Sequence, residues 1–183
     1  MERKSDGRMY SRITRRSVAI VGQIQRGREY SINEIAAAIE AKELPEFFLE
    51  RFGKQMSLPR IRDYVRYLVD LEVLSPTDNK YILALEHKHT DEDWAQALSD
   101  LALLHLAGIL RRTAAETIEY FKALLEHLFD ERRLPTIEAL LTEVDISGGR
   151  SEEVFKWSLY VFTDVDNCPF DIRRYPVLVR RGE

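Results

Sequence analysis

Apolar residues recur at helical spacing between residues 57 and 72 and leave the opposite side of the segment charged. Ser57 is a good N-cap, and Pro59 suits the first turn of a helix. These signals predict a helix over residues 58–71. The apolar positions that share one stripe of this helix are Leu58, Ile61, Val65 and Leu68.

A β-hairpin is predicted directly after this helix, over residues 72–83. Two short β-prone runs, 72–74 and 81–83, flank the turn-forming segment Ser-Pro-Thr-Asp-Asn-Lys. Helix and hairpin together resemble the winged helix-turn-helix superfamily. The resemblance implies a recognition helix at 58–71 and a wing at 72–83. This fold most often binds duplex DNA and is also used for contacts with protein.

The residues before this helix predict the other elements of such a domain. Residues 10–25 have helical spacing and precede Gly27, which fits a helix stop. Residues 28–30 fit a short strand. Ser31 and Glu34 then form a capping box at the start of a second helix.

An insertion at residues 41–56 departs from a compact helix-turn-helix, in which about 3–4 residues join the helices. We expect it to be partly helical. Its aromatic residues, Phe47, Phe48 and Phe52, either pack on the core or form an apolar patch for a partner protein.

The second half of the chain is predicted to be helical, over residues 92–112, 113–132, 136–144 and 151–162. The helix at 92–112 is apolar around nearly its whole circumference, which is typical of a central helix or of one covered by another chain. A β-prone tail follows at 169–181. It belongs either to a second, degenerate winged helix or to a helical domain whose last strand adds to a sheet or a partner.

We therefore expect a mostly α, α+β protein with three parts: a flexible basic arm at 1–9, a winged-helix domain at 10–85 and a helical domain at 90–183 for oligomerisation or partner binding. No apolar run approaches the roughly 20 residues that span a bilayer, and no signal peptide is evident, so we expect a cytoplasmic protein without membrane contact. The single cysteine, Cys168, excludes an internal disulfide.

Charge is distributed unequally between the two halves of the chain. Residues 1–83 contain 15 Lys and Arg against 12 Asp and Glu, whereas residues 84–183 contain 12 against 19. Because duplex DNA attracts basic surfaces, the basic half is the better candidate for DNA contact.

The charged face of the helix at 58–71 provides the candidate DNA-binding residues. Arg66 and Asp63 point outward, with Arg62 and Arg60 or Tyr67 on the flanks. Arg62 and Arg66 repel each other until a phosphate or a guanine edge relieves them, and Asp63 can accept from cytosine or hold its neighbours in place. Alternatively, these arginines pair with acidic neighbours on a solvated face. The expected contacts to the DNA backbone are Lys80, Arg12, Arg15 and Arg16. Arg51 and Lys54 are further candidate DNA-binding residues.

Catalytic motifs are almost absent from the sequence. It contains no GxxxxGK(S/T), GxGxxG, GxSxG or HExxH pattern, and His87 and His89 have no third metal ligand nearby. We expect no enzyme activity, no cofactor and no bound metal. A metal-dependent nuclease is the alternative, built on Asp164, Asp166 and Asp171 with Lys156.

The sequence favours a non-enzymatic DNA-binding protein, either a transcriptional regulator or the DNA-engaging subunit of an assembly. Its expected partners are double-stranded DNA and, through the second half, another copy of the chain or a partner protein. The alternative is a protein-docking adaptor whose winged helix contacts protein, with Phe47, Phe48 and Phe52 as the contact patch.

Overall fold

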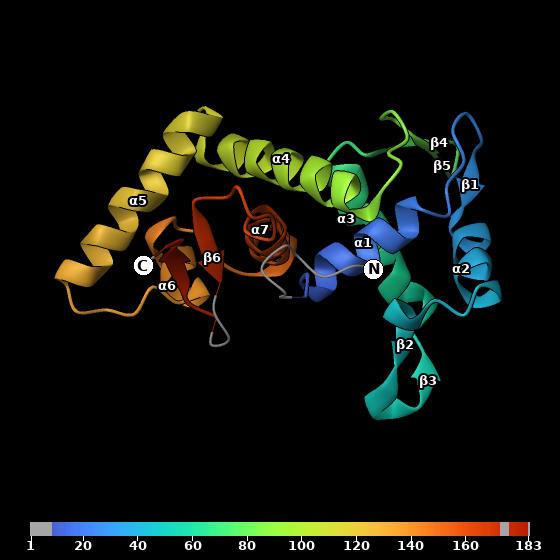
Figure 1. The fold of residues 1–183 in the computed structure, drawn as a ribbon, viewed down its shortest axis with the longest axis horizontal. Helices are drawn as coiled ribbons and strands as arrows, with labels where there is room; N and C mark the ends of the chain where they lie inside the picture. The colour runs from blue at the N-terminus through green and yellow to red at the C-terminus, as the bar shows by residue number, and fades with distance from the viewer. Residues whose placement is uncertain (1–8, 173–175, 183) are drawn as a thin grey trace. The chain divides into compact units, whose positions relative to one another are not determined.

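The computed structural model describes residues 9–172 and 176–182, and it is mostly helical with small antiparallel sheets (Figure 1). The mostly helical α+β class expected from the sequence is confirmed. The chain divides into two compact units, Met9–Leu98 and the described residues from Ser99 onward. The boundary lies within helix α4 (Asp91–Leu110), not in the polar segment at 86–90. Of the expected basic arm at 1–9, only Met9 lies among the described residues.

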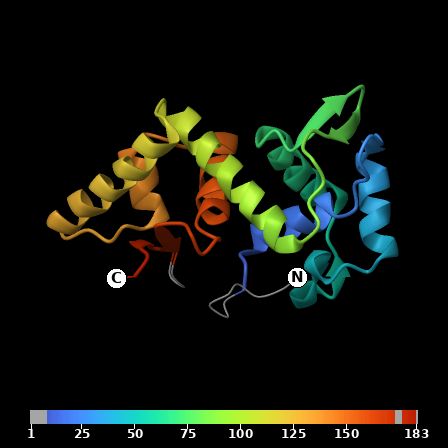
Figure 2. The same ribbon diagram turned by 45° about the horizontal axis from the view of Figure 1, so that its top comes forward.

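The first unit contains three complete α-helices, the start of α4, a three-stranded sheet and a small two-stranded hairpin. Its principal elements, in chain order, are α1 (Arg12–Val21), β1 (Tyr30–Ser31), α2 (Ile32–Ala41), α3 (Leu58–Asp70), β4 (Leu74–Thr77) and β5 (Lys80–Leu83). All strands are antiparallel and lie in the order β1-β5-β4. The strand after α1 therefore pairs with the last strand of the unit, and the β4–β5 hairpin projects beyond the helices (Figure 2).

The β4–β5 hairpin is longer, and its turn tighter, than the sequence predicted. The strands extend to Thr77 and Lys80, which pair directly across the turn. Only Asp78 and Asn79 remain between them, with φ angles of 39° and 67°. Two successive left-handed residues match the twist of a two-residue hairpin, and Asp and Asn tolerate that conformation better than most residues.

Two helix starts and one helix end show how local signals act here. The Ser31–Glu34 capping box is present at the start of α2, with the Ser31 Oγ accepting from Glu34 N at 3.1 Å. Helix α3 begins after Ser57 as predicted, although the Ser57 side chain makes no capping hydrogen bond. Helix α1 ends earlier than expected, at Val21, and Gly27 lies in the following turn with φ of 77°.

The insertion between α2 and α3 is partly helical, as expected, but its helical parts are single 3-10 turns and it is built around a small hairpin. Single 3-10 turns at Pro45–Phe47 and Glu50–Phe52 accompany the short strands β2 (Phe48–Leu49) and β3 (Lys54–Gln55). Gly53 turns the chain with φ of 59°, a conformation that favours glycine. Phe47, Phe48 and Leu49 are consecutive, so their side chains cannot share one narrow helical stripe, and a short α-helix is not favoured here.

The second unit has an order of elements similar to that of the first, except that an isolated bridge at Thr136 stands where the first unit has strand β1. After the end of α4 come α5 (Ala114–Asp130), α6 (Ile137–Glu143), α7 (Gly149–Phe162), β6 (Phe170–Ile172) and β7 (Leu178–Arg180). Strands β6 and β7 are antiparallel, and Thr136, just before α6, forms an isolated bridge with Val177, the residue before β7. The segment before α6 thus bridges to the chain next to the last strand, much as β1 before α2 pairs with β5. The expected β-prone tail pairs within this chain, and its residues 173–175 lie outside the described residues.

Each unit has its own apolar core. In the first unit, the largest fully buried side chains are Ile20, Ile24, Ile35, Ile39, Phe47, Tyr64, Tyr67, Leu68 and Leu74. In the second unit, Phe121, Phe155 and Phe170 are fully buried, and the rings of Phe121 and Phe170 meet edge to face at 6.0 Å. The Ser99 hydroxyl donates to the Phe162 carbonyl at 2.8 Å, which ties α4 to the end of α7.

Candidate functional site

Helix α3 has the features required to present side chains from a fixed position. Its apolar stripe is buried, with Ile61, Val65 and Leu68 each no more than 4% exposed. The backbone N–H groups of Arg60 and Ile61 both donate to the Ser57 carbonyl at 3.1 Å, which closes the first turn. Because one side of the helix is packed, the opposite side has a defined direction.

The outward side of α3 carries two arginines that ion pairs do not neutralise. Arg62 and Arg66 are both exposed, and neither forms an ion pair with any residue that the structure describes. Arg60 lies 3.5 Å from the Asp63 carboxylate, so this aspartate is paired with the flanking arginine. Two unpaired guanidinium groups four residues apart form a surface suited to phosphate or to a guanine edge.

Two predicted contact residues are buried, and this corrects the prediction for them. Tyr67 is 1% exposed and packs in the core. Arg16 is 7% exposed; its Nε donates to the Glu46 carbonyl at 2.9 Å, and its Nη1 donates to the Tyr64 hydroxyl at 2.8 Å. The spacing contained the signal, because Arg16 falls three residues after Ile13 and four before Ile20, on the apolar stripe of α1.

The remaining predicted DNA contacts lie at or near the surface of the first unit. Arg12 on α1, Lys80 at the β4–β5 hairpin, and Arg51 and Lys54 in the insertion are exposed. Arg15 is half-buried, and its Nε has no hydrogen-bond acceptor within the described chain. Four of these five side chains are therefore accessible to a ligand.

The three phenylalanines of the insertion have different surroundings. Phe47 is fully buried, and its carbonyl accepts from Met56 N at 2.8 Å. Phe48 and Phe52 are 41% and 65% exposed. The continuous apolar patch of three rings does not exist, because one ring fixes the hairpin to the core while the other two face solvent.

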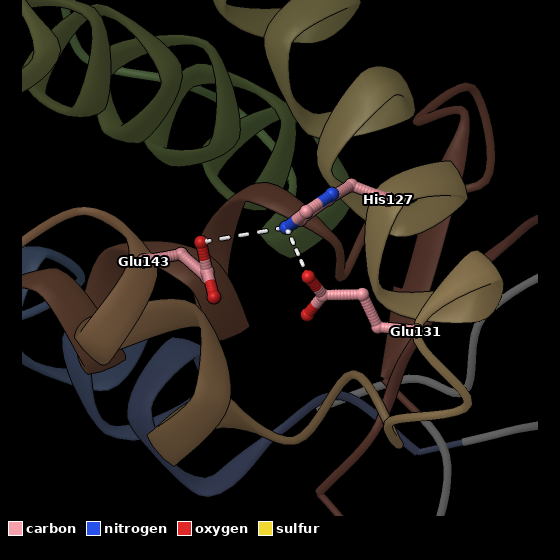
Figure 3. Close-up of side chains that lie close together, drawn as sticks. All are labelled: His127, Glu131 and Glu143. Carbon is pink, nitrogen blue, oxygen red and sulfur yellow. Dashed lines mark ion pairs between the residues drawn. The ribbon is translucent and has the colours of Figure 1, made fainter.

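A second polar cluster, which the sequence did not reveal, joins α5 to α6 in the second unit (Figure 3). The His127 Nε2 lies 3.4 Å from Glu131 Oε1 and 4.0 Å from Glu143 Oε2. His127 and Glu131 are spaced by one helical turn, which the sequence could have shown, but only folding brings Glu143 beside them.

Arg133 already provides this cluster with a cation. Its Nη1 lies 2.6 Å from Glu143 Oε1 and 3.1 Å from Glu131 Oε2, so each carboxylate uses one oxygen for arginine and the other for histidine. The hydrogen bond to Glu143, and then that to Glu131, raises the pKa of Arg133 above its ordinary value. The three potential metal ligands lie within 4.8 Å of one another. A divalent ion would have to compete with the guanidinium for both carboxylates, and the arrangement works as an ion-pair network that ties the α5–α6 connection.

One carboxylate of the nuclease alternative, that of Asp171, lies beside an arginine, and the expected lysine pairs with another residue. Asp164 is buried, Asp166 is exposed, and Asp171 lies 4.0 Å from Arg181 Nη2. The Lys156 Nζ lies 2.9 Å from Glu152 Oε1, one turn earlier on α7. Arg181 donates to four backbone carbonyls around the turn, those of Thr163, Val165, Cys168 and Phe170. These contacts are typical of a structural clamp, and the nuclease remains a hypothesis.

Comparison with protein-family models, with curated proteins and with solved structures gives no match for this chain. Across the described residues, every helix is too short or too polar to cross a membrane.

Proposed function

We propose that this chain is a DNA-binding protein that presents α3 of its first unit to the duplex as a recognition helix. The observation that carries the proposal is the exposed pair Arg62 and Arg66, which has no ion-pair partner in the described part of the chain. The competing interpretation is a solvated face of neutralised charges, and Arg60, which pairs with Asp63, fits that interpretation whereas Arg62 and Arg66 do not.

The order of elements supports assignment of the first unit to the winged helices. A winged helix contains helix, strand, two helices and then a hairpin, and here the strand after α1 pairs with the second strand of that hairpin. The β4–β5 hairpin takes the place of the wing and carries exposed Lys80. In this arrangement α3 enters the major groove, while Lys80 and Arg12 contact phosphates and fix the register.

The second unit supports a role in assembly. It has a similar order of elements, but the solvent-facing residues near the start of its third helix, α7, include Glu152 and Glu153. We infer that this unit is a second winged helix that does not approach phosphate. It exposes the large apolar side chains Leu104, Phe129 and Leu134, which are 59%, 80% and 72% exposed.

These apolar residues favour association with a second copy of the chain. A two-fold dimer would place two copies of α3 on half-sites about one helical turn of DNA apart. Sedimentation should then give twice the chain mass of 21.4 kDa, whereas a mass of one chain at micromolar concentration would contradict the dimer.

The test is duplex binding across a salt series, with Arg62→Ala/Arg66→Ala compared with the native protein. If both side chains contact phosphate, the slope of log affinity against log salt becomes shallower by about 1.8, because each phosphate contact contributes about 0.9. The matched control is Arg111→Asn/Arg132→Asn. Both residues are exposed, lie in the second unit and have left-handed φ angles of 53° and 56°, which asparagine tolerates.

The control removes the same number of positive charges, but from residues outside the proposed DNA contact. It should therefore retain the native slope of log affinity against log salt. Equal slopes for both double variants would show that only net charge matters and would refute the recognition-helix assignment. If the native protein binds no duplex at low salt, the DNA proposal fails, and the adaptor function, in which the first unit docks on protein, takes its place.

A further inference from the structure

The insertion hairpin presents aromatic and basic side chains together at its tip. We call Phe48, Arg51, Phe52 and Lys54 the hairpin tip. The base of the hairpin is fixed, because Phe47 is fully buried and Met56 N donates to its carbonyl at 2.8 Å. The residue after Met56 caps α3, so the hairpin leads directly into the proposed recognition helix.

Two cations lie beside the most exposed ring of the tip. The Arg51 Cζ is 5.7 Å and the Lys54 Nζ is 5.8 Å from the centre of the Phe52 ring. The ring itself remains 65% exposed, so most of its surface still faces water. Glu50 is the acidic residue of the loop between β2 and β3, which leaves the tip with a positive balance.

We propose that the hairpin tip binds an unpaired DNA strand, with a base stacked on Phe52 and the flanking phosphates on Arg51 and Lys54. This rests on the proposed function, because it adds a second contact to the DNA that α3 binds. The bases of an intact duplex are stacked on their neighbours, so the partner of the ring is a base at an overhang, fork or distorted step.

The combination of groups favours nucleic acid over a protein partner. An apolar protein surface that covered Phe52 would also remove water from Arg51 and Lys54 without giving them counter-charges. A DNA strand supplies a flat ring and anionic phosphates at alternating positions, so it satisfies all three side chains together.

The experiment compares two DNAs, a blunt duplex and the same duplex with a thymine overhang, and three proteins. These are the native chain, Phe52→Ala, and Ile109→Ala as the control, since Ile109 is an exposed apolar residue of the second unit, at 36%, that is not among the residues of the proposed dimer surface. Loss of one stacked base should lower the affinity of Phe52→Ala for overhang DNA roughly tenfold while its affinity for blunt duplex stays native. The Ile109→Ala protein should bind both DNAs as the native chain does.

A second readout follows the stacked base directly. With 2-aminopurine in the overhang, native protein should quench the fluorescence of the base, and Phe52→Ala should not. Native binding of overhang DNA by Phe52→Ala would overturn the proposal, as would an equal loss on both DNAs. A change in sedimentation mass with native DNA binding would identify a protein surface instead and would also overturn it.

Failure of the proposed function gives a different result. If the native protein binds the overhang DNA but no blunt duplex, and Phe52→Ala abolishes that binding, α3 is not a duplex reader while the hairpin tip still binds an unpaired strand. Binding to neither DNA would overturn both.

Discussion

Replacement of Arg16 by methionine should destabilise the first unit, although methionine resembles arginine in size and differs mainly in having no charge. Its side chain links three parts of that unit, since it lies on α1 and donates to the Glu46 carbonyl in the insertion and to the Tyr64 hydroxyl on α3. Methionine fills most of the same volume without either hydrogen bond.

The magnitude follows from two opposing contributions. Hydrogen bonds that involve a charged group contribute about 1.5–3 kcal/mol each, and Arg16 donates two. Desolvation of a buried guanidinium group costs several kcal/mol. The methionine variant does not have this cost, which offsets part of the loss of the two hydrogen bonds. We expect Arg16→Met to lower the free energy of unfolding by about 2 kcal/mol.

The pair energy is measured with a double-mutant cycle of Arg16→Met and Tyr64→Phe. The chain has two tryptophans, so a Trp157→Phe background leaves buried Trp94 as the fluorescent reporter of the first unit. Urea unfolding of the four proteins should give a coupling energy of about 1–2 kcal/mol, because either substitution alone removes the bond between Arg16 and Tyr64.

The control is Arg15→Met, on the same helix, whose Nε has no hydrogen-bond acceptor within the described residues. It should cost less than Arg16→Met. A coupling energy below about 0.3 kcal/mol would mean that the two residues act independently, and it would refute the claim that Arg16 fastens α3.

Three further substitutions test other features of the chain. Asn79→Val should lower the free energy of unfolding by about 1–2 kcal/mol in urea, because a β-branched residue resists the left-handed conformation, whereas Asn79→Gly should not. Phe121→Ala should cost about 3–5 kcal/mol, since the ring is fully buried against Phe170. The hydrogen bond from Lys156, and then that from the Gly148 N–H, lowers the pKa of Glu152 from 4.5. The stability that the ionised Glu152 gives the folded chain is therefore complete above pH 4.5 and is lost as the pH falls through the lowered pKa. Acid unfolding followed by circular dichroism should therefore be less steep below pH 4.5 for Glu152→Gln than for the native chain, and identical acid limbs would contradict this contact.

Local signals in the sequence predicted the elements that depend on neighbouring residues. The Ser31–Glu34 capping box, the apolar stripe of α3 and the turn-forming residues after it all act within a few positions, so they could be read directly. The structure of the insertion was harder to predict from the sequence, because its strands are only two residues long. They depend on Gly53 and on the burial of Phe47, and neither gives a repeating pattern of apolar residues.

The candidate surface was predictable only in part. Exposed charge on α3 follows from helical spacing, so Arg62 and Arg66 were found. Arg16 was misassigned because a charged residue on a buried stripe looks like a surface residue until its acceptors are known. The cluster of His127, Glu131 and Glu143 could not be predicted, since it depends on how α6 packs beside the end of α5.

The pairing of the last strand in each unit determines when that unit can finish folding. The sheet of the first unit is complete once β5 has been made, at Leu83. The second unit needs Val177 to bridge to Thr136, β7, at Leu178–Arg180, to pair with β6, and Arg181 to bind the four carbonyls around its turn. Since domains generally fold as units during synthesis, at about 5–20 residues per second, the first unit can fold on the ribosome while the second still waits for its final strand.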